Sequence, residues 1–455
     1  MHSRSLAGLL VILLTFLVFQ LFYLSAPHVL SDETLFAWNT SLIRSDLGSV
    51  FDSEMWQNHP PLIPVVASLL PFSPLISLRV ISILSGLLVL ILTFWLGKKW
   101  GNSVTGLFAA ALLSVVFAFT LYSHYGVLDL PLLAGLMMCI YCLVRGFETQ
   151  RWGLFAIILL VSFLIKTRAA LIILPIIVCF FVLHYFSLAP KSSRENSHKL
   201  YYYDALLFLG AMGALLVLYL FWRPATVSLS SWSLISGVFI SLLPLPAWGL
   251  VLLSFMRQYP PAWFENVSLF WIAWAASMIV LISFYGDALR FFLVGLPILC
   301  IRAAMGFEFF REKFLHIFSK KVIYFLAIFA LFLPMFAGNI IQLNSHFDDA
   351  GHPAVAEWTR GVDNAVIYTG FSRELRFYSG EPFYPEGKLR LYPYTSDQML
   401  FELSQEIRTV YAIVGPFRNP FYGTFVTEDW LRENGFVEHA RIAASKSEWI
   451  VFRRV

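Results

Sequence analysis

The chain has 455 residues, of which 58% are hydrophobic, 17% are aromatic and only 13% are charged. Soluble domains carry roughly 25% charged residues, so this composition excludes a soluble globular protein and predicts a polytopic membrane protein. The formal net charge of +4 gives no argument for a nucleic-acid partner, because basic cytoplasmic loops of a membrane protein account for it equally well.

Long apolar stretches predict the membrane path. A spanning helix needs about 20 mostly apolar residues to cross a hydrocarbon core roughly 30 Å thick. On that criterion the sequence predicts eleven spans, at residues 6–25, 75–97, 104–122, 127–145, 152–166, 169–187, 205–222, 232–256, 266–285, 289–308 and 322–340. The first is interpreted as a retained helix rather than a cleaved signal, because no small-residue cleavage site is evident and many spans follow it.

Basic loops predict how these spans are oriented. Lys and Arg are enriched on the cytoplasmic side, and they follow spans two, four, six, eight and ten, as Lys98 and Lys99 do after span two. The alternate loops carry acidic residues. We therefore expect a multi-pass protein of the inner (plasma) membrane with a cytoplasmic N-terminus and an extracytoplasmic C-terminal part.

The first outer loop, residues 27–74, differs from an ordinary connector. Aromatic residues alternate there with polar ones, which predicts helices lying in the membrane interface; these aromatic residues are Phe36, Trp38, Phe51 and Trp56. The segment Asn58-His59-Pro60-Pro61-Leu62 ends the polar part of the loop, and its double proline fixes the backbone and ends any preceding helix. The loop is therefore predicted to be a rigid polar shelf.

Charge divides the chain into two predicted domains. Of the 60 Asp, Glu, Lys and Arg residues, 27 lie in the last 111 positions, so we expect a transmembrane domain at 1–344 and a small soluble α/β domain at 345–455. Strands are predicted at Ala365–Phe371, Leu389–Tyr392, Thr409–Val414 and Trp449–Phe452, and helices at Ser396–Ile407 and Thr427–Asn434. This domain has no glycine-rich phosphate loop, HExxH motif or Cys/His cluster in its sequence. The four cysteines of the chain lie in apolar segments and are expected to be core residues.

Ionisable residues gather at the predicted outer ends of several spans. They are Asp32, Glu33, His59, Arg79, Asp129, Lys166, Arg168, Asp287 and Arg290. A carboxylate can take a proton from an attacking hydroxyl or amine, while cations can hold a phosphate and stabilise it as a leaving group. Ionisable groups at membrane depth are functional candidates by default, and this set suits a membrane-anchored phosphate donor.

Each candidate also has a purely structural interpretation. Asp32 and Glu33 could be solvated acids or acids that favour the dipole at a helix N-terminus. Asp129, followed closely by a proline, could begin span four. Lys166 and Arg168, like the other cations, could extend to the interface as anchors.

Short motifs in this order resemble a known family. They are Ser31-Asp32-Glu33 after the first span, His59-Pro60-Pro61-Leu62, Arg79 opening span two, Asp129-x-Pro131 opening span four, Lys166 closing span five, and Arg290-Phe291-Phe292 with Pro297 at span ten. Together they resemble the polyprenyl-phosphate-sugar-dependent glycosyltransferases of the GT-C class, above all protein O-mannosyltransferases and the aminoarabinose transferase that modifies lipid A. The resemblance covers most of residues 1–310.

The resemblance implies an inverting transfer of a sugar from a polyprenyl-phosphate donor to a lipid, glycan or protein acceptor at the outer face of the membrane. It implies that Asp32 is the base and Glu33 its catalytic neighbour, and that the substrate-binding residues are His59, Arg79, Asp129, Lys166, Arg168 and Arg290. A divalent metal is possible but not demanded, and no other cofactor is implied. Protein mannosyltransferases often have Gly-Lys where Ile63-Pro64 stand, and the aminoarabinose enzymes have Lys at the position of His59, so the sugar and the acceptor stay open.

Two other classes of function compete with a transferase. A lipid-linked sugar transporter or flippase would also have many spans and intramembrane charges, but such folds often carry internal repeats, and the two halves of this sequence show no convincing repeat. A non-catalytic membrane scaffold would bind a partner through its outer part. The scaffold alternative predicts that the carboxylates of the first loop are dispensable.

Overall fold

The computed structural model describes residues 2–26, 31–51, 60–149, 153–165, 245–254, 293–314, 322, 332–346, 351–379, 388–393, 395–415, 426–443 and 448–455. The sixth, seventh and ninth predicted spans lie outside these residues. The chain divides into two compact units: the first contains residues 1–22, 51–63 and 79–342, and the second contains residues 23–50, 64–78 and 343–455. Each unit is described separately.

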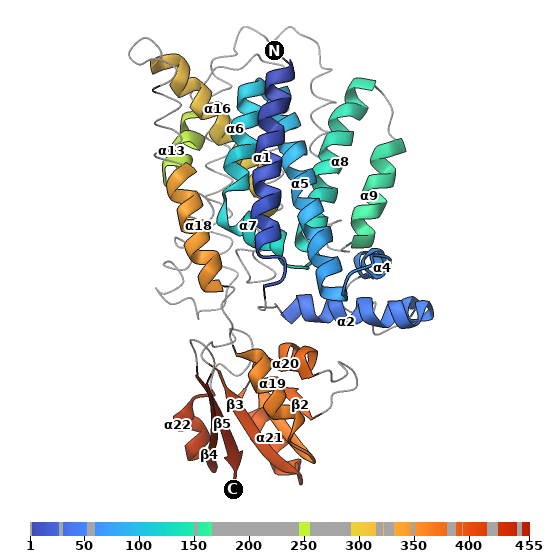
Figure 1. The fold of residues 1–455 in the computed structure, drawn as a ribbon, viewed down its shortest axis with the longest axis vertical. Helices are drawn as coiled ribbons and strands as arrows, with labels where there is room; N and C mark the ends of the chain where they lie inside the picture. The colour runs from blue at the N-terminus through green and yellow to red at the C-terminus, as the bar shows by residue number, and fades with distance from the viewer. Residues whose placement is uncertain are drawn as a thin grey trace, which may run out of the picture. The chain divides into compact units, whose positions relative to one another are not determined.

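The first unit is made of apolar helices (Figure 1). They are α1 (His2–Phe22), α5 (Pro74–Trp100), α6 (Ser103–Ser114), α7 (Phe117–His124), α8 (Asp129–Thr149), α9 (Gly153–Ile165), α13 (Leu245–Ser254), the short η3 (Leu293–Gly295), α16 (Leu296–Phe314) and α18 (Leu333–His346). Helix α6 packs against α1 and α16, α13 packs against α16, and α8 packs against α9. The polypeptide of this unit is thus mainly helical where it is described, as the sequence predicts.

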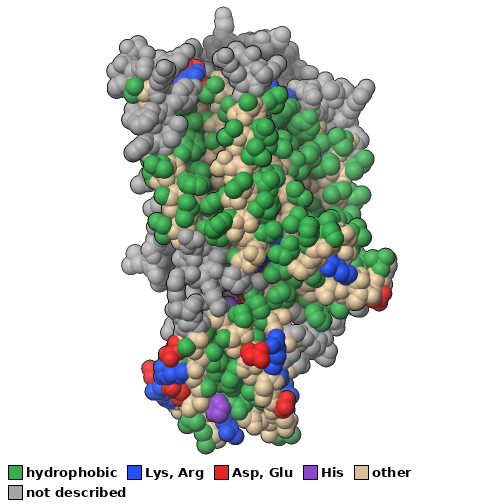
Figure 2. Space-filling model, viewed as in Figure 1, with side chains coloured by type: hydrophobic (Ala, Val, Ile, Leu, Met, Phe, Trp, Pro, Cys, Tyr) green, Lys and Arg blue, Asp and Glu red, His purple; other side chains and the backbone are tan. Residues whose placement is uncertain are grey.

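Exposed apolar side chains mark this unit as a membrane structure. On α1, Leu6, Leu10, Leu14 and Val18 recur at every fourth position and are all exposed, so one face of the helix is an apolar stripe suited to lipid. Figure 2 shows hydrophobic side chains covering the visible surface of these helices. Among the described residues, three helices are long and apolar enough to cross a membrane, or four if the bent pair α6 and α7 is one span. The protein is therefore a membrane protein.

The predicted span 104–122 is broken in the structure. Helix α6 ends at Ser114, α7 begins at Phe117, and the two axes differ in direction by 65°. Backbone carbonyls freed by such a break need new donors in a membrane. Asn339 of α18 donates from Nδ2 to the carbonyl of Val115 at 2.7 Å, and Thr120 donates its hydroxyl to the carbonyl of Val116 at 3.0 Å.

Small side chains allow close helix packing in this unit. A Cβ atom on Gly306 of α16 would collide with the backbone carbonyl of Leu250 on α13, so these two helices are in direct backbone contact, a common use of glycine in membrane helices. Cys139, Cys142 and Cys300 are free and buried, which confirms the expectation of core cysteines for these three positions.

The second unit contains a five-stranded sheet with the order β2-β1-β3-β5-β4. The strands are β1 (Ala365–Thr369), β2 (Leu389–Leu391), β3 (Thr409–Val414), β4 (Phe436–Ala443) and β5 (Glu448–Arg454), and the helices beside them are α19 (His352–Arg360), α20 (Ser372–Ser379), α21 (Ser396–Gln405) and α22 (Glu428–Glu433). Strands β1, β2 and β3 are parallel to one another, whereas β5 is antiparallel to both β3 and β4. The sheet is therefore mixed.

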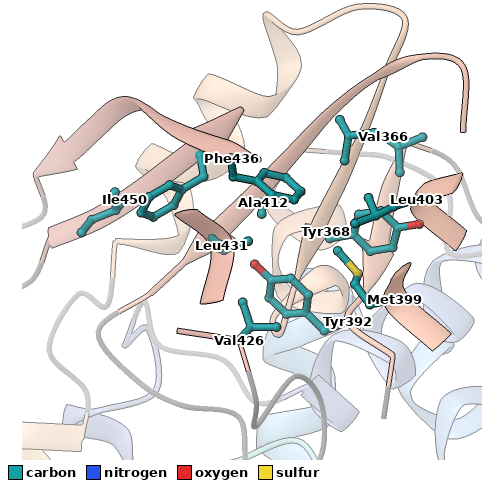
Figure 3. Packing of buried hydrophobic residues seen from close by; sticks show 12 residues of the cluster. Val366, Tyr368, Tyr392, Met399, Leu403, Ala412, Val426, Leu431, Phe436 and Ile450 are labelled. Carbon is teal, nitrogen blue, oxygen red and sulfur yellow. The ribbon is translucent and has the colours of Figure 1, made fainter. Parts of the chain in front are cut away.

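Helices cover both faces of this sheet. One core joins Val366, Tyr368, Tyr392, Phe436 and Phe452 to side chains of α21 and α22, and Figure 3 shows Met399 and Leu403 of α21 lying beside Tyr368 in this core. The opposite core joins the other face of the same strands to side chains of α19 and α20. The arrangement is a three-layer α/β/α sandwich in which α20 and α21 lie on opposite faces.

Parts of the predicted first loop belong to this second unit. They are α2 (Ser31–Ser45), η1 (Leu47–Phe51), most of α4 (Leu62–Ser68) and the first turn of α5. Helix α2 packs against α20. At its other end, Arg44 donates from Nη1 to the carbonyl of Phe72 at 2.8 Å and from Nη2 to that of Leu70 at 3.0 Å, with longer contacts to the carbonyls of Ala67 and Ser68. A single guanidinium therefore caps the C-terminal end of α4.

Candidate active site

The acidic pair predicted to carry catalysis lies in the first turn of α2. Both carboxylates interact favourably there with the positive end of the helix dipole. The two side chains differ in access: that of Asp32 is 29% exposed, whereas Glu33 is completely buried. A general base must come within hydrogen-bond reach of the proton that it takes, and the partly exposed Asp32 is better placed for this than the buried Glu33.

Helix α20 brings two more ionisable residues to this place. Arg373 Nη1 lies 3.7 Å from Asp32 Oδ1, and the Arg373 side chain is 31% exposed. The next residue, Glu374, is 7% exposed. Burial raises the pKa of Glu374 to about 7, with Asp32 raising it further and Arg373 lowering it. Each helix thus presents one charged side chain to solvent and buries the following one.

A second polar cluster lies within the helices of the first unit. Arg79 of α5 and His124 of α7 are both buried, and they are close enough for the arginine charge to act on the imidazole. Gln20 of α1 is also buried and donates from Nε2 to the carbonyl of Thr120 on α7 at 3.0 Å. Buried charge inside a helical membrane protein is costly and is by default a candidate for function. The burial of Arg79 therefore keeps it a candidate substrate-binding residue.

Asp129 stands at the start of α8. This position fits the structural interpretation, because an acidic residue with a proline two residues later is a good helix start. The residue is nevertheless buried, with 7% of its surface exposed, so it is not a solvated loop acid.

The other predicted site residues lie outside the residues that the structure describes. They are His59, Lys166, Arg168 and Arg290, and their roles stay predictions. Of the double proline that follows His59, Pro60 is buried and Pro61 lies in the turn that leads into α4. Within the described ranges, no group of three or more His, Cys, Asp or Glu side chains is arranged to hold a metal ion.

Sequence reasoning missed three of these ionisable residues. His124 occurs in the polar run Ser123-His124 at the end of an apolar span, a signal that was available. Arg373 and Glu374 gave no such signal, because they lie in a charged segment more than 300 positions after Asp32. The contact between α2 and α20 is what connects them to the acidic pair.

Comparisons with known proteins agree with this architecture. Residues 58–216 match the family model described as dolichyl-phosphate-mannose-protein mannosyltransferase. The fold is similar to that of ArnT from Cupriavidus metallidurans in the apo state, with a TM-score of 0.56 and 14% sequence identity over 99% of this chain and 98% of that one. It is equally similar to the same ArnT bound to undecaprenyl phosphate, with a TM-score of 0.56 and 14% identity over 98% of both chains. No curated protein sequence matches the chain.

These findings define the fold of the protein. The chain has the fold of the ArnT transferase over almost its whole length, and part of its membrane region matches the mannosyltransferase model. The resemblance to GT-C proteins of the mannosyltransferase and aminoarabinose transferase type, drawn from short motifs, is thereby confirmed.

Proposed function

We propose that this protein is a membrane glycosyltransferase that uses a polyprenyl-phosphate-linked sugar as donor. The observation that carries the proposal is the whole-length fold similarity to ArnT, one of whose structures is bound to undecaprenyl phosphate, together with the mannosyltransferase match in the membrane region. The acceptor is a lipid, glycan or protein at the outer face of the membrane. The N-terminus is cytoplasmic, and residues 345–455 form an extracytoplasmic α/β domain.

The proposed reaction is a single inverting displacement. Asp32 accepts the proton of the acceptor hydroxyl or amine as that group bonds to the anomeric carbon of the sugar. The bond between the anomeric carbon and the phosphate oxygen breaks at the same time, and the lipid phosphate leaves with the bonding electron pair. Cations stabilise the charge that develops on that phosphate, and Lys166, Arg168 and Arg290 are the proposed residues. Arg79, which is buried in α5, is proposed as a further substrate-binding cation.

Substrate positioning is proposed for the remaining candidates. His59 and Asp129 are assigned to binding the sugar or acceptor, in keeping with their positions before α4 and at the start of α8. Glu33, which is completely buried, is proposed as the catalytic neighbour of Asp32. No step of this reaction requires a metal ion.

A transfer assay in membranes tests the proposal. Membranes containing the protein are supplied with undecaprenyl-phosphate-linked mannose, glucose or aminoarabinose, each labelled in the sugar. We expect label to move to an acceptor with release of one undecaprenyl phosphate per sugar. Asp32→Asn should lower turnover by about a hundredfold or more, the range for loss of a general base, whereas Asp46→Asn, at an exposed acid just after α2, should keep the wild-type rate.

Two results would reject the transferase. Label that crosses the membrane while still linked to lipid phosphate would show a transporter instead. Absence of any donor consumption would favour the scaffold alternative. Turnover that is unchanged by Asp32→Asn, at equal protein level, would instead remove Asp32 from the base role and leave the transferase in place.

A further inference from the structure

Arg373 occupies an unusual position for an arginine. It is the second residue of α20, where the helix dipole disfavours a cation by roughly 0.3–1 kcal/mol. A positive charge at a helix N-terminus needs a compensating partner, and the described partner is the Asp32 carboxylate at 3.7 Å. This distance is longer than a hydrogen bond, so the attraction between Arg373 and Asp32 is electrostatic.

The position of Arg373 relative to the sheet is also informative. Strand β1 is followed by α20 on one face, whereas the connection from β2 to β3 runs through α21 on the opposite face. In open α/β sheets with strand order 2-1-3, ligands bind at the carboxyl ends of the strands where the connections diverge in this way. Arg373 comes shortly after the carboxyl end of β1, in helix α20, and α2 packs against that helix.

Two further carboxyl groups lie near Asp32, so a cation beside it favours its ionised form. Its sequence neighbour Glu33 is a second carboxyl group, and Glu374 lies close enough for its charge and that of Asp32 to interact. Like charges at such short range oppose one another's ionisation, whereas an arginine within about 4–6 Å favours it. A general base must be ionised to accept a proton.

We propose that Arg373 is a positioning residue for Asp32, through which the sheet-bearing unit keeps the base ionised and aimed at the acceptor. This inference rests on the proposed function, because it gives Arg373 a role only if Asp32 is the base. It assigns to the C-terminal part of the chain a direct contribution to turnover. Both side chains are partly exposed, so an acceptor that reaches one also lies near the other.

The test compares variants of the full-length protein in the membrane assay, using the labelled undecaprenyl-phosphate sugar that supports transfer. Arg373→Met removes the charge and keeps the length of the side chain, and we expect kcat to fall about tenfold, or about 1.4 kcal/mol of barrier, with the donor KM changed less than about twofold. Arg373→Lys, which retains the charge, should restore kcat to within about threefold of wild type. Arg432→Met, at an exposed arginine of α22 in the same unit, should behave as wild type.

A double-variant cycle separates positioning from a general structural effect. If Arg373 acts through Asp32, then Arg373→Met in the Asp32→Asn background should cost less than about a twofold further loss, because the two residues form one coupled unit. The thermal midpoints of Arg373→Met and Arg432→Met should be alike.

The possible failures are distinguishable. A wild-type kcat in Arg373→Met, an effect confined to the donor KM, or a tenfold loss that persists in the Asp32→Asn background would each overturn the role of Arg373 while leaving Asp32 as the base. Wild-type turnover in Asp32→Asn alone would overturn the proposed base and the role of Arg373 with it.

Discussion

Glu374 is a buried carboxyl group whose protonation should control the stability of the sheet-bearing unit. Burial raises its pKa from 4.5 to about 7, which means that the folded state prefers the neutral acid. A carboxyl group with a raised pKa in the folded state contributes its full stability below pH about 4.5, the unfolded value, and this contribution is lost as the pH rises through about 7. The unit should therefore weaken between these two values and change little from this group above them.

The size of the effect follows from the shift. One pKa unit corresponds to about 1.4 kcal/mol, so a shift from 4.5 to about 7 amounts to about 3 kcal/mol. Because the side chain is only 7% exposed, solvent screening does not reduce this figure greatly. Glu374→Gln replaces the ionisable group with a neutral one of the same shape. We expect the variant to exceed the wild type in stability by up to about 3 kcal/mol at pH 8 and to match it at pH 4.

Thermal unfolding of the full-length protein in detergent measures this difference. Wild type and Glu374→Gln are melted at pH 4, 6 and 8. At each pH the contributions of the other titrating groups are common to both proteins and cancel in the difference between the two midpoints. A gain of about 3 kcal/mol in a unit of this size corresponds to roughly 6–12 °C. Glu433→Gln, at an exposed position of α22, controls for the loss of one formal charge. A difference between wild type and Glu374→Gln that is the same at pH 4 and pH 8 would refute the reasoning.

Three further predictions follow from packing, capping and the proposed donor site. Gly306→Ala should lower the free energy of unfolding by about 1–3 kcal/mol or more, because the added Cβ meets the backbone of α13, and the thermal midpoint and expression should both fall. Gly249→Ala, whose Cβ has nothing within 4 Å, should be neutral or slightly stabilising. Arg44→Ala should lower local stability by about 1–3 kcal/mol through the loss of two charge-assisted hydrogen bonds, and should therefore increase protease cleavage after α4. Arg44→Lys should restore only part of the lost stability. Equal cleavage of the wild type and both variants would contradict the capping role. Arg290→Ala should raise the donor KM about tenfold in the transfer assay, since it removes a phosphate contact, and wild-type donor dependence would count against that assignment.

Much of the helical framework could be predicted from the sequence, because apolar length decides it. The predicted span 75–97 corresponds to α5 (Pro74–Trp100), and 152–166 corresponds to α9 (Gly153–Ile165). In the second unit, two predicted helices begin where Thr395 and Thr427 accept backbone N–H groups as N-caps. Gly435, with φ of 82°, follows the C-cap Asn434 of α22, a position at which glycine commonly ends a helix.

Other features could not be predicted because distant residues decide them. The break after Ser114 has neither proline nor glycine at it, and Asn339, more than 200 positions later, satisfies the freed carbonyl. Helices α19 and α20 and strand β4 were not predicted, since their short segments mix polar and apolar residues without a clear period and acquire their structure by packing on or pairing within the sheet. The same reason applies to the candidate site: Asp32 could be found from a local motif, but its ion pair with Arg373 depends on the fold.

The discontinuity of the second unit has a consequence for biosynthesis. Its residues come from 23–50, 64–78 and 343–455, so α2 is synthesised more than 300 residues before α20, its packing partner. Chains emerge N-terminus first, and contacts between distant segments form late. The contact between α2 and α20 can therefore form only after the last quarter of the chain has begun to be made. A nascent protein that stalls before residue 343 cannot form the ion pair between Asp32 and Arg373, so the arrangement at Asp32 depends on synthesis of the C-terminal part of the chain.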